Sequence, residues 1–392
     1  MDDFLSIFAR RRGSFLTRCY FFGLILTLVF SFLVSCDQAE LSESNSQING
    51  EINDFVHLVV DAKKSAKIDS FFTSRYKHRA FNGTVLIAEK GRIVYENAFG
   101  FANFKEKDSL KTNSVFQLAS VSKPLTSFAV LMLYDRGKLD LEDDVQKYFP
   151  DFPYENITIR LLLSHRSGLP EYMYFADKLW PSRSKPITNQ DVLSLMIKFK
   201  PYKYYDPGKR YNYSNTNYCL LVLIIEKVSG MTFENFMKSQ IFEPLGMNNS
   251  YVLRYEDIKE PEIDNVVVGY NKRGRRAENS YLNGVVGDKG IFSTVEDLFK
   301  WDTAIYQGRL VRKETMEEAF KPAHKDLRLN DNYGFGWRIN ENDGDKIVFH
   351  SGWWKGFRTY YIRKLSEQKT IIVLTNTARH NFISIRKLTG LI

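Results

Sequence analysis

The chain has 392 residues, of which 44% are hydrophobic and 26% are charged, and its formal net charge is +9. This composition is too apolar for a disordered protein and too charged for a polytopic membrane protein. The sequence shows no collagen, heptad or solenoid repeat, and its length suits one large or two modest domains with a sizeable core.

Residues 1–36 have the organisation of an export signal. Four arginines precede an apolar run over residues 20–34, and the tetrapeptide Leu-Val-Ser-Cys ends at Cys36. A basic region, a short apolar core and small residues before a cleavage point are typical of secretory signals. The tetrapeptide resembles the lipobox of bacterial lipoproteins, so we predict a lipoprotein signal peptide over residues 1–35 and lipid on Cys36.

An uncleaved membrane anchor is the alternative, but the apolar run is at the short end for a membrane span, which needs about 20 residues. Either interpretation predicts a protein of the bacterial cell envelope that faces the periplasm or the cell surface. The Ser-, Glu- and Asn-rich residues 36–52 predict a flexible tether. Cys219, the one cysteine of the sequence after the tether, lies in an apolar stretch that predicts a buried structural thiol.

The N-terminal third of the remaining chain combines helical and strand patterns. Helical spacing runs over residues 54–79, and strand patterns at 83–88 and 92–95 flank a Glu-Lys-Gly turn, which indicates a hairpin. A long apolar helix is predicted over about residues 120–136, closed by Gly137.

Residues 140–285 show mostly short helical patterns joined by loops that contain proline and glycine. The basic cluster at 272–276 has a central glycine and predicts a solvent-exposed hairpin tip, and no nucleic-acid-binding signature accompanies it. Strand patterns then return at 333–339, 346–349, 358–363 and 370–375, and residues 380–391 have a helical pattern.

Strands at both ends and helices in the middle predict an α/β (α+β) fold, with an antiparallel sheet flanked by helices and an inserted, mostly helical lobe. We assign residues 53–392 to this domain. Its sheet lobe would comprise about 53–139 and 286–392, and its helical lobe about 140–285. A cleft between two such lobes is a usual place for a binding or catalytic site.

Several familiar catalytic motifs are absent from the sequence. It contains no Gly-x-Ser-x-Gly elbow, no His-Glu-x-x-His and no P-loop, and its six histidines lack metal-ligand spacing. A classical α/β-hydrolase and a zinc hydrolase are therefore disfavoured, and no metal is expected.

Ser120 and Lys123 form a Ser-x-x-Lys pair at the start of the long apolar helix, where the two side chains share one face. A serine hydroxyl is a poor nucleophile until a base takes its proton. A lysine can be that base if burial or a nearby cation lowers its pKa from about 10.4. The same spacing recurs at Ser74, Ser182, Ser366 and Ser384. For this pair alone, a helix cap with a solvent-exposed lysine is the alternative.

Tyr213 and Asn215 follow a predicted turn and precede a helix predicted from about Thr216. A tyrosine with a depressed pKa can shuttle a proton, and an amide can hold a substrate carbonyl. The Tyr-x-Asn spacing recurs elsewhere in the chain, and capping of the following helix is the alternative.

His350, Gly352 and Trp353 end a predicted strand. Gly352 lets a substrate backbone approach the strand closely, and the N–H of Trp353 can join that of Ser120 in an oxyanion hole. Taken alone, the motif favours a strand end that carries a polar cap.

In this order, the three motifs resemble those of the penicillin-recognising serine hydrolases, most closely the class C β-lactamase-like branch that includes D-aminopeptidases, DD-peptidases and esterases. Four further stretches are similar to sequences of that family: 161–169, 211–218, 244–247 and 287–294. The similarity covers about residues 70–376 and implies the family's β-lactamase/transpeptidase-like fold, a sheet-and-helix lobe with an inserted helical lobe.

The resemblance also implies a role for each motif residue. Ser120 would be the acylated nucleophile, activated by Lys123, with Tyr213 as the proton shuttle. Asn215 would position the substrate, and the amides of Ser120 and Trp353 would bind the oxyanion. No metal or organic cofactor is implied.

His350 departs from the pattern of true β-lactamases, which carry the lysine of Lys-Thr-Gly at this position. A histidine is mostly neutral at pH 7, whereas lysine offers a fixed cation for a substrate carboxylate. Weak or no β-lactamase activity is therefore expected.

These expectations describe an envelope serine hydrolase that acts on an ester or amide through a covalent acyl-enzyme, of carboxylesterase or D-amino-acid peptidase type. The alternatives are a sensor or pseudoenzyme that binds a β-lactam or peptidoglycan fragment without turnover, and a structural envelope lipoprotein. The expected partners are a small ester, D-amino-acid peptide or β-lactam, and the membrane through lipid on Cys36. Tyrosines at 202, 204 and 205 and tryptophans at 353 and 354 are candidates for binding aromatic or acyl groups, or for packing between the lobes.

Overall fold

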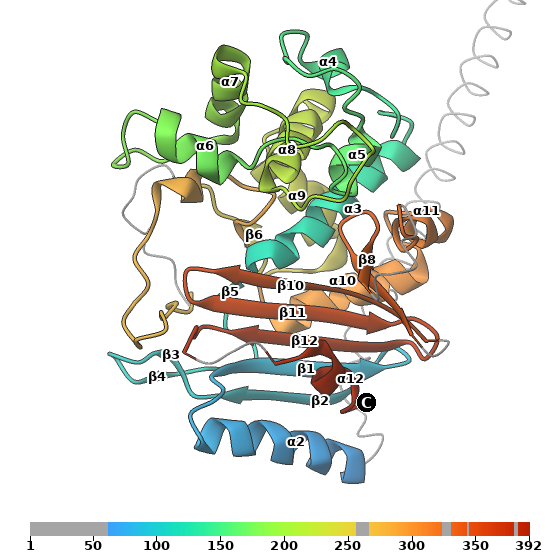
Figure 1. Cartoon of the computed structure of the whole chain (residues 1–392). Coiled ribbons are helices and arrows are strands. Elements are labelled where there is room, and N and C mark those ends of the chain that lie inside the picture. The colour runs from blue at the N-terminus through green and yellow to red at the C-terminus, as the bar shows by residue number, and fades with distance from the viewer. Residues whose placement is uncertain (1–61, 256–265, 324–330, 343–344, 380–382) are drawn as a thin grey trace, which may run out of the picture. The chain divides into compact units, whose positions relative to one another are not determined.

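A seven-stranded antiparallel sheet joins the two ends of the described chain (Figure 1). The computed structural model describes residues 62–255, 266–323, 331–342, 345–379 and 383–392. The strands are β1 (Gly83–Glu89), β2 (Arg92–Phe99), β8 (Asp331–Tyr333), β9 (Arg338–Asn342), β10 (Asp345–Trp354), β11 (Phe357–Lys364) and β12 (Lys369–Thr375). They lie in the order β2-β1-β12-β11-β10-β9-β8, so the N-terminal hairpin pairs with the last strand.

The predicted hairpin at the start of the sheet is confirmed. Lys90 and Gly91 both have positive φ between β1 and β2, as a tight turn requires. The single strand predicted over residues 333–339 is wrong, because the chain turns between β8 and β9. Gly334 N donates to Trp337 O at 2.9 Å, and Gly336 has φ +84°, which favours glycine.

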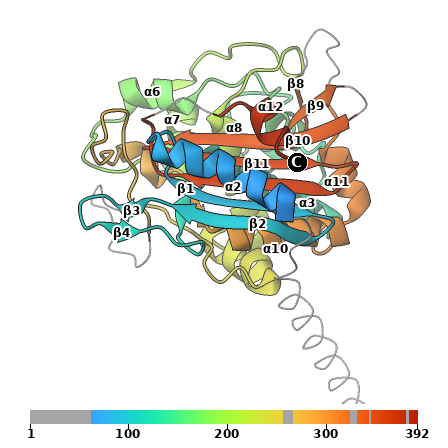
Figure 2. The ribbon, with the colours of Figure 1, turned by 90° about the horizontal axis from the view of Figure 1, so that it is seen from below.

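Two helices cover one face of the sheet. They are α2 (Ala62–Lys77) and α12 (Ile385–Thr389), which lie across the strands in Figure 2. The apolar residues Ile68, Phe72 and Leu388 of these helices share a buried cluster with alternate residues of the strands. The predicted N-terminal helix extends outside the described residues before Ala62. The helix predicted over residues 380–391 is reduced in the described part to the five residues of α12.

On the opposite face, α10 (Val295–Gln307) packs against β1 and β12, and α11 (Lys313–Ala319) contacts α10 and α3 (Ser122–Asp135). Apolar residues of α3 and α10 share one buried cluster with the strands. Beyond α3 lie the helices of the middle of the chain: α4 (Val145–Tyr148), α5 (Ile159–Leu163), α6 (Tyr172–Leu179), α7 (Asn189–Phe199), α8 (Asn215–Ser229) and α9 (Phe233–Met237). In Figure 1, α3 runs between the sheet and these helices. Its first residues therefore meet both structural parts.

Short elements connect the larger ones. The small strands are β3 (Phe101–Asn103), β4 (Asp108–Ser109), β5 (Phe116–Gln117), β6 (Tyr251–Val252) and β7 (Ile291–Ser293). The single helical turns are η1 (Ala119–Val121), η2 (Lys238–Phe242), η3 (Glu243–Leu245) and η4 (Tyr281–Gly284). Strands β5, β7 and β6 form a separate sheet, which ties the residues before η1 to the chain that follows the middle helices.

The structure does not test the domain boundaries predicted from the sequence. The signal peptide over residues 1–35, Cys36 and the tether over 36–52 lie outside the described residues. The proposed division into a sheet lobe and a helical lobe stays a prediction. Within the described part of the chain, no helix has the combination of length and hydrophobicity that a membrane crossing requires.

A buried ion pair holds α10 against the sheet. Arg363 Nε on β11 lies 2.8 Å from Asp302 Oδ1 on α10, and both side chains are almost fully buried. The carboxylate also accepts hydrogen bonds from the hydroxyls of Tyr361 and Thr370, at 2.7 and 2.8 Å. Because its oxygens are met by several donors, the desolvation of Asp302 is well compensated.

We expect Asp302→Ala to lower the free energy of unfolding by about 3–5 kcal/mol, because it leaves the Arg363 charge buried and uncompensated. Urea denaturation of the purified protein measures this. Glu367→Ala is the matched control, since it removes a solvent-exposed partner of Lys364 and Lys369 and should cost less than about 1 kcal/mol. Equal costs for the two variants would contradict the assignment.

Candidate active site

Ser120 lies in η1, in a turn that is held from both sides. Leu118 N donates to Ile291 O at 2.9 Å, and Leu118 O accepts from Thr359 Oγ1 at 2.6 Å. The next residue, Ala119, has φ +51°, a left-handed conformation that costs free energy for a residue with a side chain. The helix predicted from residue 120 therefore begins as a 3₁₀ turn and becomes α-helical at Ser122.

Lys123 is one turn further along, and its side chain is fully buried. Its Nζ lies 3.2 Å from Ser120 Oγ, within hydrogen-bond reach. The same nitrogen donates to the side-chain oxygen of Asn215 at 2.7 Å and to the backbone carbonyl of Asp288 at 2.9 Å. The alternative of a solvent-exposed lysine beside a capping serine is thus wrong for this pair.

Burial lowers the pKa of Lys123 to about 8, with Arg338 lowering it further and the carboxylates of Asp288 and Glu171 opposing the change. At pH 8 about half of the amine is therefore neutral. A neutral amine is a proton acceptor, which is the form that a base for Ser120 needs.

Tyr213 borders the same space. The Lys123 Nζ lies 4.9 Å from the centroid of its ring. Burial raises the pKa of Tyr213 above its ordinary value, against a hydrogen bond with Ser120 and the charge of Arg338. The pKa of Tyr213 is thus not depressed, and the phenol carries its proton at neutral pH.

Asn215 is the first residue of α8, so the tyrosine and the amide flank the start of one helix. Its Oδ1 faces Lys123, and its Nδ2 donates to Glu171 Oε2 at 3.1 Å. Ser214, at the N-cap position, makes no capping hydrogen bond through its side chain. Capping therefore does not account for the side chains of this motif.

His350 lies on β10 and is almost fully buried. Its Nδ1 lies 2.9 Å from the carbonyl oxygen of Ser351, which can only accept, so Nδ1 carries the hydrogen. The hydroxyl of Tyr333 then donates to Nε2 at 3.1 Å. Burial, together with the charges of Arg338 and Lys123, holds the pKa of His350 well below its usual range. The residue is a neutral imidazole with both nitrogens in use.

Gly352 brings β10 against the amide of Ser120. A Cβ at this position would lie 2.8 Å from Ser120 N and 2.5 Å from Leu118 O. Strand β9 pairs with β10 only as far as Phe349. Among the described residues, no strand pairs with the rest of β10 on that edge.

The side chains of the two tryptophans lie apart. Trp353 is 57% exposed and its ring stacks with the guanidinium of Arg358, 5.8 Å away, on the face of the sheet opposite to Gly352. Trp354 Nε1 donates to Asn283 Oδ1 at 2.8 Å. For Trp353, a role in the site would come from its backbone N–H, as the sequence predicts, and not from its ring.

Tyr204, one of the three tyrosines at 202, 204 and 205 that were candidates for substrate binding, is hydrogen-bonded to a residue of the site. Its hydroxyl accepts from the backbone N–H of Glu171 at 3.4 Å. Tyr202 is 94% exposed. Tyr204 therefore lies beside the N-terminus of α6, and Tyr202 is on the surface rather than in the core between the helices.

Three residues at the site were not singled out from the sequence. Glu171 bonds the amide of Asn215, Asp288 supplies a carbonyl to Lys123, and Thr359 holds the turn before Ser120. Asp288 falls inside one of the family-like stretches, but its contribution is a backbone oxygen that no side-chain motif reports. Contacts so far apart in sequence carry no local signal.

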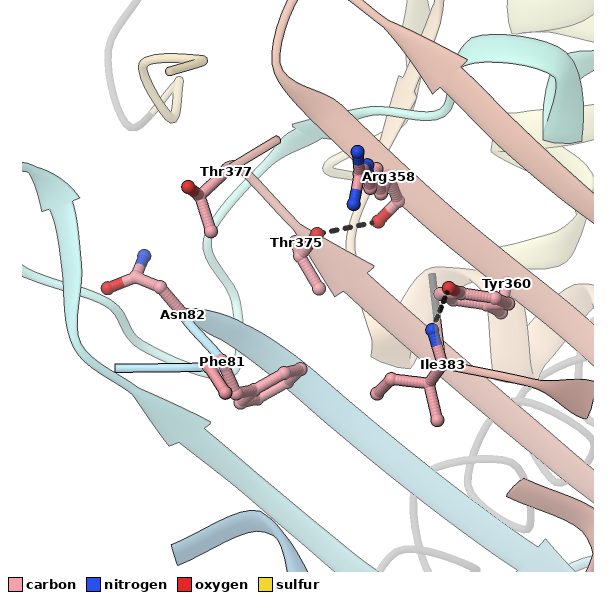
Figure 3. A pocket seen from close by; sticks show the side chains of 8 residues that line it. Phe81, Asn82, Arg358, Tyr360, Thr375, Thr377 and Ile383 are labelled. Atoms are coloured by element: carbon pink, nitrogen blue, oxygen red, sulfur yellow. Dashed lines mark hydrogen bonds between the residues drawn. The ribbon is translucent and has the colours of Figure 1, made fainter. Parts of the chain in front are cut away.

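Two cavities lie away from these residues, on the side of the sheet where Phe81 and Tyr360 are buried. The one in Figure 3 is small, about 20 Å³, and is lined by residues such as Tyr360, Thr375 and Ile383. A neighbouring cavity of about 460 Å³ shares Phe81 and Asn82 with it. None of the predicted catalytic residues lines either cavity. The described residues also contain no group of His, Cys, Asp or Glu arranged to hold a metal.

Comparison with known proteins places this geometry in a family. The family model described as Beta-lactamase matches residues 68–388. The chain belongs to this family. It is thus a serine hydrolase of the β-lactamase-like group, as the three motifs implied, and its fold is the expected one.

Relatives within the group carry different names. Penicillin-binding protein 4* of Bacillus subtilis (strain 168) is 40% identical over 331 residues, which are 80% of this chain and 72% of the relative. The D-aminopeptidase of Brucella anthropi is 26% identical over 301 residues, 75% of this chain. This chain spans only 56% of that aminopeptidase and 63% of a second penicillin-binding relative from Bacillus subtilis.

Solved structures share the fold. The octameric penicillin-binding protein homologue from Pyrococcus abyssi aligns with a TM-score of 0.69 and 30% identity, covering 80% of this chain and 74% of that one. The D-amino acid amidase from Ochrobactrum anthropi SV3, solved with L-phenylalanine, aligns with a TM-score of 0.69 and 24% identity, covering 84% of this chain and 95% of that one.

We expect Gly352→Ala to reduce the rate of acylation of this hydrolase by about 100-fold or more, because the added Cβ displaces the amide of Ser120. The rate is measured with any ester or amide substrate that the wild type turns over. Gly83→Ala is the matched control: its Cβ would be as crowded, 2.1 Å from Leu374 O, but lies in β1. That variant should lose stability while its folded fraction keeps the wild-type rate. Wild-type acylation by Gly352→Ala would rule out the predicted arrangement.

Proposed function

We propose that this protein hydrolyses an ester or amide bond through a covalent acyl-enzyme on Ser120. The observation that supports it most is the buried amine of Lys123, 3.2 Å from Ser120 Oγ, with a pKa lowered to about 8. A buried base held against a serine hydroxyl is the arrangement that nucleophilic catalysis requires. A structural serine and lysine would not need it.

The chemical steps follow from the positions of the groups. Ser120 Oγ attacks the substrate carbonyl carbon as its proton passes to Lys123 Nζ. The oxyanion that forms would accept hydrogen bonds from the N–H groups of Ser120 and Trp353. Tyr213, which holds its proton at neutral pH, then protonates the leaving amine or alcohol and is reprotonated from Lys123. Water completes the cycle by attacking the acyl-enzyme along the same proton path.

The substrate class we propose is an ester or a D-amino-acid amide or peptide, with weak or no activity on β-lactams. The names of the relatives, a D-aminopeptidase and penicillin-binding proteins, support this choice. His350 supports it further: it is neutral, and its two nitrogens are bonded to Tyr333 and Ser351. It therefore offers no cation for the carboxylate of a β-lactam at the position where β-lactamases carry lysine.

The decisive comparison is the wild type beside Ser120→Ala on three substrates: a short-chain chromogenic ester, a D-Ala-D-Ala peptide and a chromogenic cephalosporin. We expect the wild type to turn over the ester or the peptide and to hydrolyse little of the cephalosporin. Ser120→Ala should show no turnover of any of the three substrates. Persistent turnover in the variant would exclude Ser120 as the nucleophile. A stable adduct on Ser120 of the wild type without turnover would instead identify a sensor.

We further propose that the protein is a lipoprotein of the cell envelope, anchored through Cys36. The tetrapeptide before the cysteine and the basic and apolar segments before it support this. The catalytic unit would then act on substrates outside the cytoplasmic membrane.

In a bacterial host, full-length wild type should yield an N-terminal peptide that begins at a lipidated Cys36, detected by mass spectrometry. Cys36→Ser should give no lipidated product. Cys19→Ser is the control and should behave as the wild type, because that residue leaves with the signal peptide. An intact, unlipidated N-terminus on the wild type would contradict the proposal.

A further inference from the structure

Glu171 is a buried carboxylate that joins the starts of two helices beside the site. It is only 8% exposed. Its Oε2 accepts from the backbone N–H of Asn215, the first residue of α8, at 2.8 Å, and its Oε1 accepts from Met173 N in α6 at 3.3 Å. Burial raises the pKa of Glu171, and the N–H donors oppose that rise. Helix N-termini favour an anion at such a place.

Glu171 Oε2 also accepts a hydrogen bond from the side-chain amide of Asn215, whose Nδ2 lies 3.1 Å away. An amide has one end that donates and one end that only accepts. An ionised carboxylate only accepts, so the NH₂ end of Asn215 must face Glu171. The oxygen end is thereby turned toward Lys123, where Oδ1 lies 2.7 Å from Nζ.

This orientation matters for the direction of the lysine lone pair. A neutral amine has two N–H groups and one lone pair. Asn215 Oδ1 and the carbonyl oxygen of Asp288 can accept but cannot donate, so they take the two N–H groups. The lone pair is left for the third neighbour of Nζ, the hydroxyl of Ser120. If the side-chain amide of Asn215 rotated by 180°, its NH₂ group would face the N–H groups of Lys123, and two donors cannot form a hydrogen bond.

We propose that Glu171 is a positioning residue for the acylation step, which fixes the amide of Asn215 so that Lys123 directs its lone pair at Ser120. This inference rests on the proposed function of Ser120 and Lys123. Glu171 need not touch the substrate, because it acts through Asn215.

The charge of Glu171 gives the proposal a signature in pH. The titratable and charged groups around Lys123 are Glu171, Tyr213, Tyr218, Asp288, Lys289, Arg338, His165 and His350. Glu171 favours the ammonium form of Lys123, so removal of its charge lowers the pKa of the lysine. Since the neutral amine is the active form, the acid limb of kcat/KM then moves to lower pH.

The test compares the wild type, Glu171→Gln and Glu171→Leu in the full chain, with an ester that the wild type hydrolyses. The wild-type acid limb should lie near pH 8. In Glu171→Gln, which keeps an acceptor but not the charge, the limb should move down by about half a unit to one unit with most of kcat retained. Glu171→Leu, which leaves the amide free to turn, should lose about 10-fold to 100-fold in kcat.

Asp297→Asn is the matched control. Asp297 is a buried carboxylate that also accepts a backbone N–H, from Asn249 at 2.7 Å, but it lies on α10 and does not contact Asn215. This variant should lose stability without any shift of the acid limb. The control is needed because Glu171 also caps α6, so destabilisation alone would not distinguish a positioning role from a structural one.

A second readout does not depend on turnover. The pKa of Lys123 can be followed by the ¹³Cε chemical shift in protein with labelled lysines, with the signal assigned through Lys123→Arg. It should fall in Glu171→Gln and stay unchanged in Asp297→Asn. If the wild type fails to acylate Ser120, the proposed function fails, yet this titration still tests the arrangement. An unmoved Lys123 pKa, or a Glu171→Leu variant with wild-type kcat and pH profile, would overturn the inference.

Discussion

The structure of the site depends on how one buried amine is held. Lys123 has lost its water, and three oxygens replace it: one from its own helical turn, one from the start of α8 and one from the segment before β7. Removal from water favours the neutral form, and the oxygens define the direction of its lone pair. Each of the three comes from a different part of the chain. Helices and sheet must therefore be assembled before the serine has a base.

Ser120 itself is fixed by the sheet. The turn before it is hydrogen-bonded to β7 on one side and β11 on the other, and Gly352 lets β10 approach its amide. The left-handed conformation of Ala119 costs free energy, and these contacts hold the residue in that conformation. The ion pair between Asp302 and Arg363 binds α10 to the same sheet face. Stability and geometry are thus linked, because the sheet that holds the fold together also positions the turn that carries Ser120.

His350 is the basis of the substrate preference that we propose. The position that holds a lysine in true β-lactamases here holds an imidazole that burial keeps neutral and that Tyr333 and Ser351 saturate. A cation is replaced by a group that has no free donor. The substrate preference that we propose follows from this change in charge, and the acyl transfer that we propose for Ser120 does not depend on it.

The sequence by itself determined the fold class, the family and the set of motif residues, since hydrophobic periodicity and short motifs are local properties. It could not separate the Ser120 pair from the four other Ser-x-x-Lys matches by spacing alone, and it did not give the direction in which the pKa of Tyr213 is shifted. Only the tertiary structure decided that burial raises that pKa, that the ring of Trp353 lies on the far face of the sheet, and that Glu171 accepts a hydrogen bond from the amide of Asn215. These features arise only when distant segments pack together. Packing removes a side chain from water, decides which face of the sheet is covered, and joins residues 44 positions apart by a hydrogen bond.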